Sequence, residues 1–309
     1  MKVAEGMLLD KLPPVRGRLQ EKANLAIKSR WGVGGPAEVL FVPEDLDDLV
    51  FFLSNIDDDL PITVLGFMSN VLIRSGGIDG VVIILSNWFR KAFVEDGIFE
   101  VGAIVGCSEL STMAMNHELG GLEFLMGLPG SIGGAIKMNA GCYGSEISDV
   151  LLELEGVSRS GKIRWLKNSD LDFRYRNSGI SNDLIITRAW FRGIRHADYS
   201  VHKKIHEINK KREEAQPIHK KTCGSTFKNP EGIAAWELIH KAGCRGMRIG
   251  GASVSDKHCN FIINDNNATA DDIENLALKV ANKVHETFGV VLEWEVVRLG
   301  KKRSSDNNG

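Results

Sequence analysis

The sequence GLPGSIGGAIKMNAG, residues 127–141, has the composition of a ligand-binding loop rather than that of a regular helix or strand. Glycine permits positive φ angles and lets backbone amides approach a ligand closely. A run of such amides forms a concavity suited to a pyrophosphate. Two further clusters, GVGGP at 32–36 and GFMSN at 66–70, lie next to strand patterns. One cluster alone is more often a turn than a site, but three with serine and asparagine beside them favour a large phosphate-bearing cofactor.

Composition places the chain among ordinary globular proteins. Its 309 residues are 43% hydrophobic and 25% charged, and the length predicts about two or three domains. The net charge of -2 argues against nucleic-acid binding. The longest apolar run, Val81–Leu85, is too short to cross a membrane, and residues 1–17 hold no signal-peptide core. Five cysteines without a C-x-x-C pair predict reduced, mostly buried thiols. We expect a soluble cytosolic protein without a membrane, nucleic-acid or metal partner.

Hydrophobic periodicity outlines the elements. The first 85 residues have the pattern of a strand–helix–strand α/β unit, and residues 99–191 that of short strands and turns. A helix over 198–216 follows, and another begins at the capping sequence Thr269-Ala270-Asp271-Asp272 and ends at Gly289. We expect the last residues, 301–309, to be frayed. The other predictions are a helix at 43–55 and strands at 62–65, 81–85, 152–157, 163–165, 184–191 and 290–299.

The segment GVSRSGK, residues 156–162, resembles the phosphate-binding loop of NTPases only superficially. The eighth position of that motif must be Ser or Thr to hold magnesium, and here it is Ile163. Because Ile163-Arg164-Trp165 alternates as a strand does, the segment is predicted to be a hairpin turn. No G-x-G-x-x-G fingerprint occurs, which disfavours a Rossmann dinucleotide site.

Over about residues 20–300, a series of motifs resembles the UDP-N-acetylenolpyruvoylglucosamine reductase (MurB) family. The motifs are SRWGVGGP at 29–36, residues 66–72, GLEF at 121–124, residues 128–141, YRNS at 175–178, QP at 216–217, CGSTFKNP at 223–230, and 292–296. The resemblance implies an α+β/α/β chain with a two-domain FAD-binding fold of the PCMH/VAO type and a third, α+β substrate-binding domain. The implied domains are 1–85, joined by the segment near 296–303, then 86–214 and 215–295.

The resemblance also implies an activity. Members of the family hold FAD tightly without a covalent bond. NADPH reduces the flavin, and flavin N5 then passes a hydride to the vinyl carbon of the UDP-sugar enolpyruvate, forming UDP-N-acetylmuramate for bacterial peptidoglycan. The cofactor carries the redox chemistry while the protein supplies orientation and electrostatics. A cytoplasmic bacterial monomer is expected.

Three residues match the family's catalytic positions. Hydride addition leaves negative charge beside the substrate carboxylate as an enediolate, which needs stabilisation and then one proton. Arg176 would bind the enediolate through its planar fork, Glu295 would assist it, and Ser225 would protonate the carbon. From pattern alone, Arg176 is a surface charge and Ser225 a turn serine. Cys223, nearby, is interpreted as a packing residue rather than a nucleophile.

The family's FAD-binding pattern falls mainly on the glycine clusters. At Met68 the family usually has glycine, so we expect a negative φ or a strained backbone there, with a reshaped pyrophosphate loop. Phe67 also replaces a commonly small residue. The matching positions are Gly32, Gly34, Gly35, Gly66, Phe67, Met68, Ser69, Asn70, Gly130, Ser131, Gly133, Gly134, Asn139 and Gly141.

For the nucleotide-sugar, the resemblance implies Tyr175, Lys228 and Asn229, and adds Lys241 as a diphosphate contact. A lysine on a helix surface is ordinarily solvated. No tyrosine-bearing insertion follows Arg176, which indicates the shorter subtype of the family. Two alternatives remain open: another FAD-dependent oxidoreductase of the same fold group, and a non-catalytic flavin-binding relative.

Overall fold

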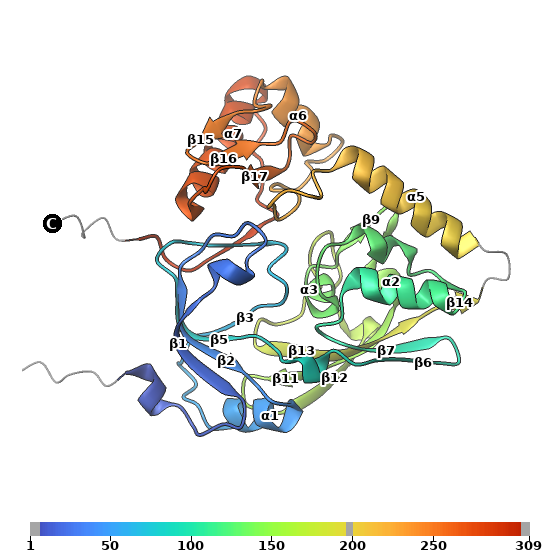
Figure 1. Cartoon of the computed structure of the whole chain (residues 1–309). Helices are drawn as coiled ribbons and strands as arrows, with labels where there is room; N and C mark the ends of the chain where they lie inside the picture. Colours follow the sequence, from blue (N-terminus) through green and yellow to red (C-terminus); the bar gives the residue numbers. More distant parts are fainter. Residues whose placement is uncertain (1–6, 196–199, 304–309) are drawn as a thin grey trace, which may run out of the picture. The chain divides into compact units, whose positions relative to one another are not determined.

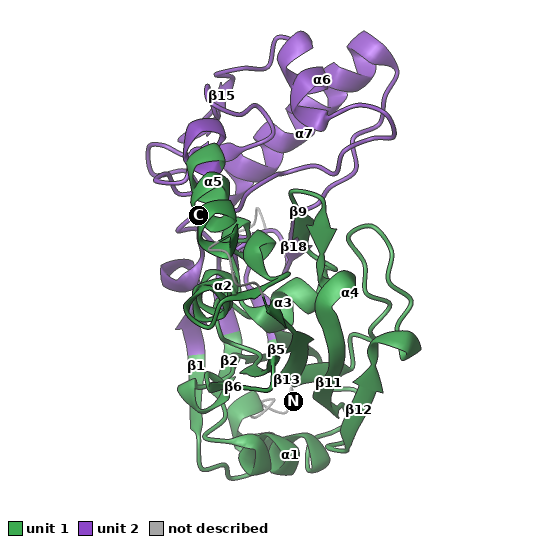
Figure 2. Ribbon diagram, turned by 90° about the vertical axis from the view of Figure 1, so that its right-hand side faces the viewer, with its two compact units in different colours: residues 1–21, 38–67, 80–211 green, residues 22–37, 68–79, 212–309 purple. Residues whose placement is uncertain are grey.

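The computed structural model describes residues 7–195 and 200–303 (Figure 1). The chain divides into two compact units, coloured separately in Figure 2. Unit 1 comprises Met1–Glu21, Glu38–Phe67 and Gly80–Lys211, and unit 2 comprises Lys22–Ala37, Met68–Asp79 and Arg212–Gly309. Both units are therefore assembled from segments far apart in the sequence.

The described residues form the following helices and strands, and Figure 1 labels many of them. The α-helices are α1 (Leu46–Ser54), α2 (Cys107–Asn116), α3 (Ile132–Lys137), α4 (Ile147–Val150), α5 (Ser200–Ala215), α6 (Ala235–Lys241) and α7 (Ala270–Phe288). The 3-10 helices are η1 (Leu8–Lys11), η2 (Ala26–Lys28), η3 (Asn87–Phe89), η4 (Glu123–Gly127) and η5 (Asn168–Asp170). The strands are β1 (Arg18–Asn24), β2 (Pro36–Val42), β3 (Ile62–Val64), β4 (Val71–Ile73), β5 (Ile78–Ile83), β6 (Ala92–Glu95), β7 (Ile98–Gly102), β8 (Leu119–Gly120), β9 (Gly141–Cys142), β10 (Ser145–Glu146), β11 (Leu151–Ser158), β12 (Ile163–Lys167), β13 (Leu184–Arg192), β14 (Ile194–Arg195), β15 (Arg248–Ile249), β16 (Ala252–Val254), β17 (Ile262–Asn264) and β18 (Val297–Leu299).

The main sheet of unit 1 has the strand order β12-β11-β13-β7-β6, and all its neighbours are antiparallel. A second sheet has the order β1-β2-β5-β3, with β3 parallel to β5. Helix α1 contacts β11, and α3 contacts β13 and β7. The core includes Phe41, Phe52, Phe99 and Phe191, which are fully buried. These rings pack within a core that is mainly aliphatic, and Phe41 and Phe52 lie 4.3 Å apart between their centroids.

Several local predictions for unit 1 are confirmed. The Asp45 carboxylate accepts a hydrogen bond from the Asp48 amide at 2.9 Å, which caps α1. Strands β11 and β12 form the hairpin predicted in place of an NTPase loop, with Gly161 at φ +74° in its turn. The predicted helix over 198–216 is α5, although residues 198 and 199 lie outside the described residues.

Unit 2 is built around α7, which contacts β15, β16 and β17, while α6 packs on α7. The predicted capping box is confirmed, since Thr269 Oγ1 accepts from the Asp272 amide at 3.0 Å. Gly289 ends the helix at φ +70°, where a left-handed residue is required. The apolar face of α7 joins Trp31, Leu72 and Phe227 in the core of this unit. Among the helices of the described ranges, none is long and apolar enough to cross a membrane.

The predicted strand over 290–299 is wrong for most of its length. Only β18, Val297–Leu299, is a strand, and it pairs in parallel with β4. The preceding residues make an isolated bridge instead, between Trp294 and Phe227. The alternating pattern indicated a strand, but Trp294 pairs only through this single bridge, and Phe227 belongs to no strand. At the predicted frayed end, Lys301 exchanges backbone hydrogen bonds with Gly76 and Gly77, and residues 304–309 lie outside the described ones.

A buried ion pair fixes α7 to the β4–β18 pair. Glu274 of α7, with 2% of its side chain exposed, accepts hydrogen bonds from Arg74 Nη2 at 2.7 Å and Arg74 Nε at 3.0 Å. Arg298 Nη1 of β18 lies 3.5 Å from the same carboxylate. The hydrogen bonds from Arg74 hold the pKa of Glu274 below its usual value. The carboxylate thus stays charged although it is buried.

We predict that Glu274→Gln lowers the free energy of unfolding near neutral pH by about 3 to 5 kcal/mol, because a buried pair loses one partner. The folded-state pKa of Glu274 is depressed, so this contribution is present above 4.5 and is lost as pH falls through the lower folded value. Urea unfolding of wild type and variant at several pH values measures the difference. Glu286→Gln, at an exposed position of the same helix, is the control. If the difference in the free energy of unfolding between wild type and Glu274→Gln did not change with pH, the depressed pKa assigned to Glu274 would be contradicted.

Candidate functional site

Two of the glycine clusters meet within unit 1. A Cβ atom on Gly66 would lie 2.6 Å from Ser131 Oγ, so a larger residue here would require the Ser131 hydroxyl to move. The second loop is fixed from behind, because the Gly130 carbonyl accepts from the Cys107 amide at 2.9 Å and the Gly133 amide donates to the Ala103 carbonyl at 2.8 Å. The sequence prediction that these segments act together is supported by this contact.

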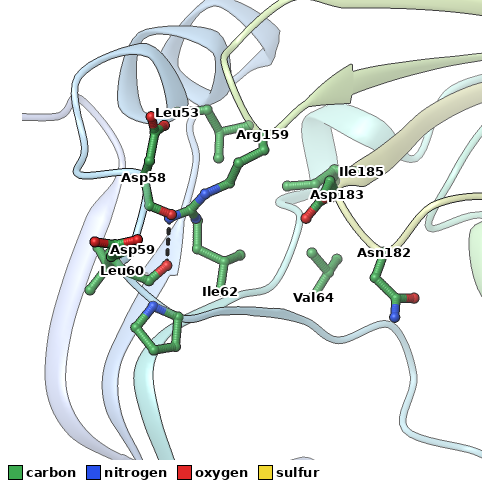
Figure 3. Close-up of a pocket in the computed structure, with 11 residues that line it drawn as sticks. Leu53, Asp58, Asp59, Leu60, Ile62, Val64, Arg159, Asn182, Asp183 and Ile185 are labelled. Atoms are coloured by element: carbon green, nitrogen blue, oxygen red, sulfur yellow. Dashed lines mark hydrogen bonds between the residues drawn. The ribbon is translucent and has the colours of Figure 1, made fainter.

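A cavity of about 260 Å³ opens in unit 1 beside β3, two residues before Gly66 (Figure 3). Its apolar wall includes Leu53, Ile62, Val64 and Ile185, and its polar members include Asn182, Asp183 and Asp58. Figure 3 shows the Arg159 guanidinium turned toward the Leu60 carbonyl and away from Asn182 and Asp183. The cavity therefore combines apolar side chains with several charged and polar ones.

The loop that carries Asn182 and Asp183 is held in place by Lys137 of α3. Lys137 Nζ donates to the carbonyls of Ile180 and Ser181 at 2.6 and 2.7 Å. Burial lowers the pKa of this ammonium, whereas the nearby Asp183 carboxylate acts in the opposite direction. This lysine connects the rim of the cavity to the glycine-rich segment, and the sequence reasoning did not identify it.

Arg176 stands in a tight turn that is joined to the glycine-rich segment 127–141. Arg174 and Asn177 exchange backbone hydrogen bonds at 2.8 and 3.0 Å, and Arg176 has φ +58°. Its Nη2 donates to the Gly141 carbonyl at 3.1 Å, and its guanidinium lies 4.9 Å from the centroid of the Tyr175 ring. A left-handed non-glycine residue is strained, and such strain concentrates at functional sites. Arg176 is therefore not the solvated surface charge that its basic neighbourhood suggested.

Asn139 supports this turn from inside unit 1. Its side chain is fully buried, its Nδ2 donates to the Arg174 carbonyl at 3.2 Å, and its Oδ1 accepts from the Ser148 amide at 3.1 Å. The amide named as a cofactor contact thus holds the arginine turn against α4. Gly141 also faces this region, since a Cβ there would lie 2.6 Å from Glu146 Cβ.

In unit 2, backbone pairing brings the segments of Ser225 and Glu295 together. The Thr226 carbonyl accepts from the Glu295 amide at 2.9 Å, and the Lys228 amide donates to the Glu293 carbonyl at 2.8 Å. Phe227 and Trp294 form an antiparallel bridge between these bonds. Ser225, one residue before Thr226, is therefore held next to the segment that carries Glu295.

Asn260 fixes this arrangement and was missed by the sequence reasoning. It is 3% exposed, its Oδ1 accepts from the Phe227 amide at 3.0 Å, and its Nδ2 donates to the Phe227 carbonyl at 2.8 Å. Its own carbonyl accepts from the Thr226 amide at 2.7 Å. The available signal was an asparagine within the otherwise apolar run Cys259-Asn260-Phe261-Ile262, because a buried amide requires partners.

Met68 adopts the strained alternative expected for it. Its φ is +48°, the left-handed region that costs an L-residue about 1 to 2 kcal/mol, while its side chain is only 4% exposed. The Cys223 thiol lies within hydrogen-bonding distance of the carbonyls of Met68 and Val71, at 3.5 and 3.6 Å. Burial raises the pKa of Cys223 to about 12. The prediction that Cys223 is a packing residue rather than a nucleophile agrees with this buried, protonated thiol.

The remaining predicted residues differ in how they are placed. Gly34 and Gly35 are packed against their own unit: a Cβ on Gly34 would lie 2.9 Å from Ile73 Cβ, and one on Gly35 would overlap the Gly77 amide. Asn229 Oδ1 accepts from the Ala235 amide at 3.0 Å, at the start of α6. These residues have structural tasks whether or not a ligand is bound.

The charged residues assigned to the nucleotide-sugar are more exposed. Lys228 Nζ lies 3.4 Å from Glu293 Oε2, and Lys241 Nζ lies 3.6 Å from Glu237 Oε2 one helical turn away. Lys241 is thus placed as an ordinary solvated helix lysine. Arg176 and Tyr175 belong to unit 1, whereas Ser225, Glu295 and these lysines belong to unit 2.

Comparison with known proteins agrees with the fold and the glycine-rich site. Residues 37–167 match an FAD-binding domain. The chain is therefore an FAD-binding protein with the predicted fold. Residues 216–299 match the C-terminal domain of UDP-N-acetylenolpyruvoylglucosamine reductase. The chain belongs to the UDP-N-acetylenolpyruvoylglucosamine reductase family, and the resemblance noted in the sequence is confirmed.

Individual relatives cover nearly the whole chain. The reductase of Parvibaculum lavamentivorans is 47% identical over 300 residues, 97% of each chain, and that of a Bradyrhizobium species is 46% identical over 95% of this chain and 96% of the relative. The crystal structure of the reductase (MurB) from Thermus caldophilus has a TM-score of 0.80 at 32% identity and covers 93% of this chain and 100% of that one.

We predict that Met68→Gly is more stable than Met68→Ala by about 1 kcal/mol. Both variants lose the buried side chain, but only glycine relieves the left-handed strain. Urea unfolding of the two purified proteins measures this difference directly. If the alanine variant were as stable as the glycine variant, or more stable, residue 68 would not have positive φ in these variants.

Proposed function

We propose that this chain reduces the enolpyruvyl group of UDP-N-acetylenolpyruvoylglucosamine with FAD and NADPH, forming UDP-N-acetylmuramate for peptidoglycan synthesis. Membership of the reductase family over nearly the full length supports this activity. The structural observation that carries it is the pairing of the Ser225 segment with the Glu295 segment, held by Asn260. That pairing places an O–H donor and a carboxylate on adjacent segments, as protonation of an enediolate requires.

The residues of unit 1 fit the cofactor. The contact between Gly66 and Ser131 brings two glycine-containing loops together, and we propose that the pyrophosphate binds along them. The cavity next to β3 has apolar walls and a polar rim, and we assign it to the adenine end of FAD. When bound, FAD supplies the hydride that reaches the vinyl carbon of the substrate. The protein's contribution is to orient both partners and to handle charge and protons.

Arg176 binds the charge that develops on the substrate carboxylate. A guanidinium presents several donors in a fixed plane, so it can hold both oxygens of an enediolate. The left-handed turn and the bond to the Gly141 carbonyl set its direction before substrate arrives. Such preorganisation is the main way in which a site stabilises charge in the transition state.

Ser225 donates its hydroxyl proton to the carbanionic carbon. A serine hydroxyl is a weak acid, so its proton must be replaced through a partner or a water molecule. Glu295 is assigned to assist Arg176 and to hold the substrate carboxylate. Lys228, Asn229 and Tyr175 are assigned to the nucleotide-sugar, and Lys241 has the weakest support because it pairs with Glu237.

The finer expectations complete the proposal. We assign the chain to the bacterial cytoplasm as a monomer that uses no nucleic-acid or membrane partner, and we keep the domain limits at 85, 214 and 295. Within the described residues, no group of three or more His, Cys, Asp or Glu could hold a metal ion. The alternative of a non-catalytic flavin-binding protein would have FAD bound without reoxidation by the enolpyruvyl sugar.

We predict that Ser225→Ala binds FAD and is reduced by NADPH as wild type, while reoxidation by the enolpyruvyl sugar slows by at least about 100-fold, because general acid catalysis contributes on that scale. Anaerobic stopped-flow absorbance separates the two half-reactions. Ser160→Ala, at an exposed serine of unit 1, should change neither rate. Unchanged reoxidation in Ser225→Ala would remove this serine from the proton transfer.

We predict that Val64→Trp weakens FAD binding by about tenfold or more, a loss of about 1.4 kcal/mol, because the indole fills the cavity. Val64 is 40% exposed, so the fold should tolerate the larger side chain. Flavin fluorescence titration of the apoprotein measures the affinity. Ile163→Trp, on β12 and 46% exposed, is the matched control. Equal affinities in all three proteins would move the adenine out of this cavity.

A further inference from the structure

Asn70 lies where the glycine cluster at 66–70 enters β4, and it contacts Glu295 and Val297. Its Nδ2 donates to the Glu295 carbonyl at 3.0 Å, across 225 residues of sequence. Its own backbone carbonyl accepts from the Val297 amide, also at 3.0 Å. All these atoms belong to unit 2. One asparagine thus holds the residues on both sides of Val296.

This geometry follows from the pairing of β4 with β18. The two strands are parallel, with Val71 opposite Val297. Asn70 precedes one strand and Glu295 lies just before the other, so the two residues meet where the ladder begins. The first residue pair of the β4–β18 ladder is Val71 and Val297. The Asn70 side-chain amide adds one hydrogen bond just before this pair, to the Glu295 carbonyl.

The peptide of Glu295 is therefore tied in two directions. Its N–H donates to the Thr226 carbonyl at 2.9 Å, in the segment of Ser225, and its C=O accepts from Asn70. The bond to Thr226 uses only backbone atoms, so a side-chain substitution at Asn70 does not remove it directly. The bond to Asn70 depends on the identity of a side chain, so it is the one that substitution can remove.

We infer that Asn70 is a positioning residue for Glu295, in addition to any contact it makes with the cofactor. This inference rests on the proposed function, since it gives the carboxylate of Glu295 a role in the reaction of the substrate. An amide nitrogen carries two hydrogens and the amide oxygen accepts, so a bond to Glu295 leaves groups for a second partner. Asn70 thus connects the proposed flavin-binding loop at 66–70 to the backbone of Glu295. It fixes the position of the Glu295 carboxylate relative to that loop.

A double-mutant cycle tests this assignment. Asn70→Ala should retain FAD and its reduction by NADPH, but slow flavin reoxidation by the enolpyruvyl sugar by up to about 100-fold, the scale of an ångström-sized misplacement. In a Glu295→Gln background the same substitution should change reoxidation by less than about twofold, because coupled residues are not additive. Independent, multiplicative effects of the two substitutions would overturn the inference.

The controls separate the ways in which the test can fail. Asn266→Ala, at an exposed asparagine of unit 2, should behave as wild type. Loss of FAD from Asn70→Ala with normal reoxidation of the flavin that remains would make Asn70 a cofactor contact only, and would overturn the inference. Normal reoxidation in Glu295→Gln alone would overturn it too, and would place the error in the role of Glu295. Wild-type flavin that the sugar does not reoxidise would instead contradict the proposed function.

Discussion

The parallel pairing of β4 with β18 is the constraint on which unit 2 depends. It joins Val71–Ile73 to Val297–Leu299, so the chain must close a very long loop before these hydrogen bonds can form. Arg74 follows β4 and Arg298 lies in β18, and both reach the carboxylate of Glu274 on α7. The helix, the strand pair and the loop before β4 are therefore stabilised as one cooperative group, and the functional segments inherit their positions from it.

Three of the eight non-glycine residues with positive φ in the described part of the chain are predicted site residues. Met68, Asn139 and Arg176 all have positive φ although none is glycine. Each is held by neighbours: the Cys223 thiol faces the carbonyl of Met68, while Asn139 and Gly141 hold the turn of Arg176. Such conformations persist only when the surrounding structure over-determines them. The strain at these points is consistent with loops shaped for a ligand rather than for their own conformational preference.

Much of the fold was accessible from the sequence because the signals are local. The cap at Thr269, the end of α7 at Gly289 and the turn at Gly161 each depend on a few neighbouring residues. The expected strand over 290–299 failed because its partner, the segment around Phe227, is distant in sequence. An alternating pattern predicts an extended chain, but it does not say whether a sheet lies beside it.

In the candidate site, too, local motifs could be predicted from the sequence, whereas contacts between distant residues could not. The motifs predict Ser225, Glu295 and Arg176 as site residues, since the residues next to them are distinctive. They did not reveal Asn260, Lys137 or the contact between Asn70 and Glu295, because these depend on atoms that only folding brings together. For Asn139, the motif suggested a ligand contact, whereas the side chain is used inside the protein. Sequence similarity identifies positions, and geometry decides what each side chain is available to do.

The buried thiol of Cys223 has a consequence for inhibitor chemistry. With a pKa of about 12, on the order of one thiol in 10⁵ is ionised near neutral pH, and only the thiolate reacts with electrophiles. A cysteine two residues from Ser225 would otherwise invite acrylamides, chloroacetamides and peroxide. Here the thiol is 3% exposed and its pKa is raised, so we expect it to react slowly with such electrophiles.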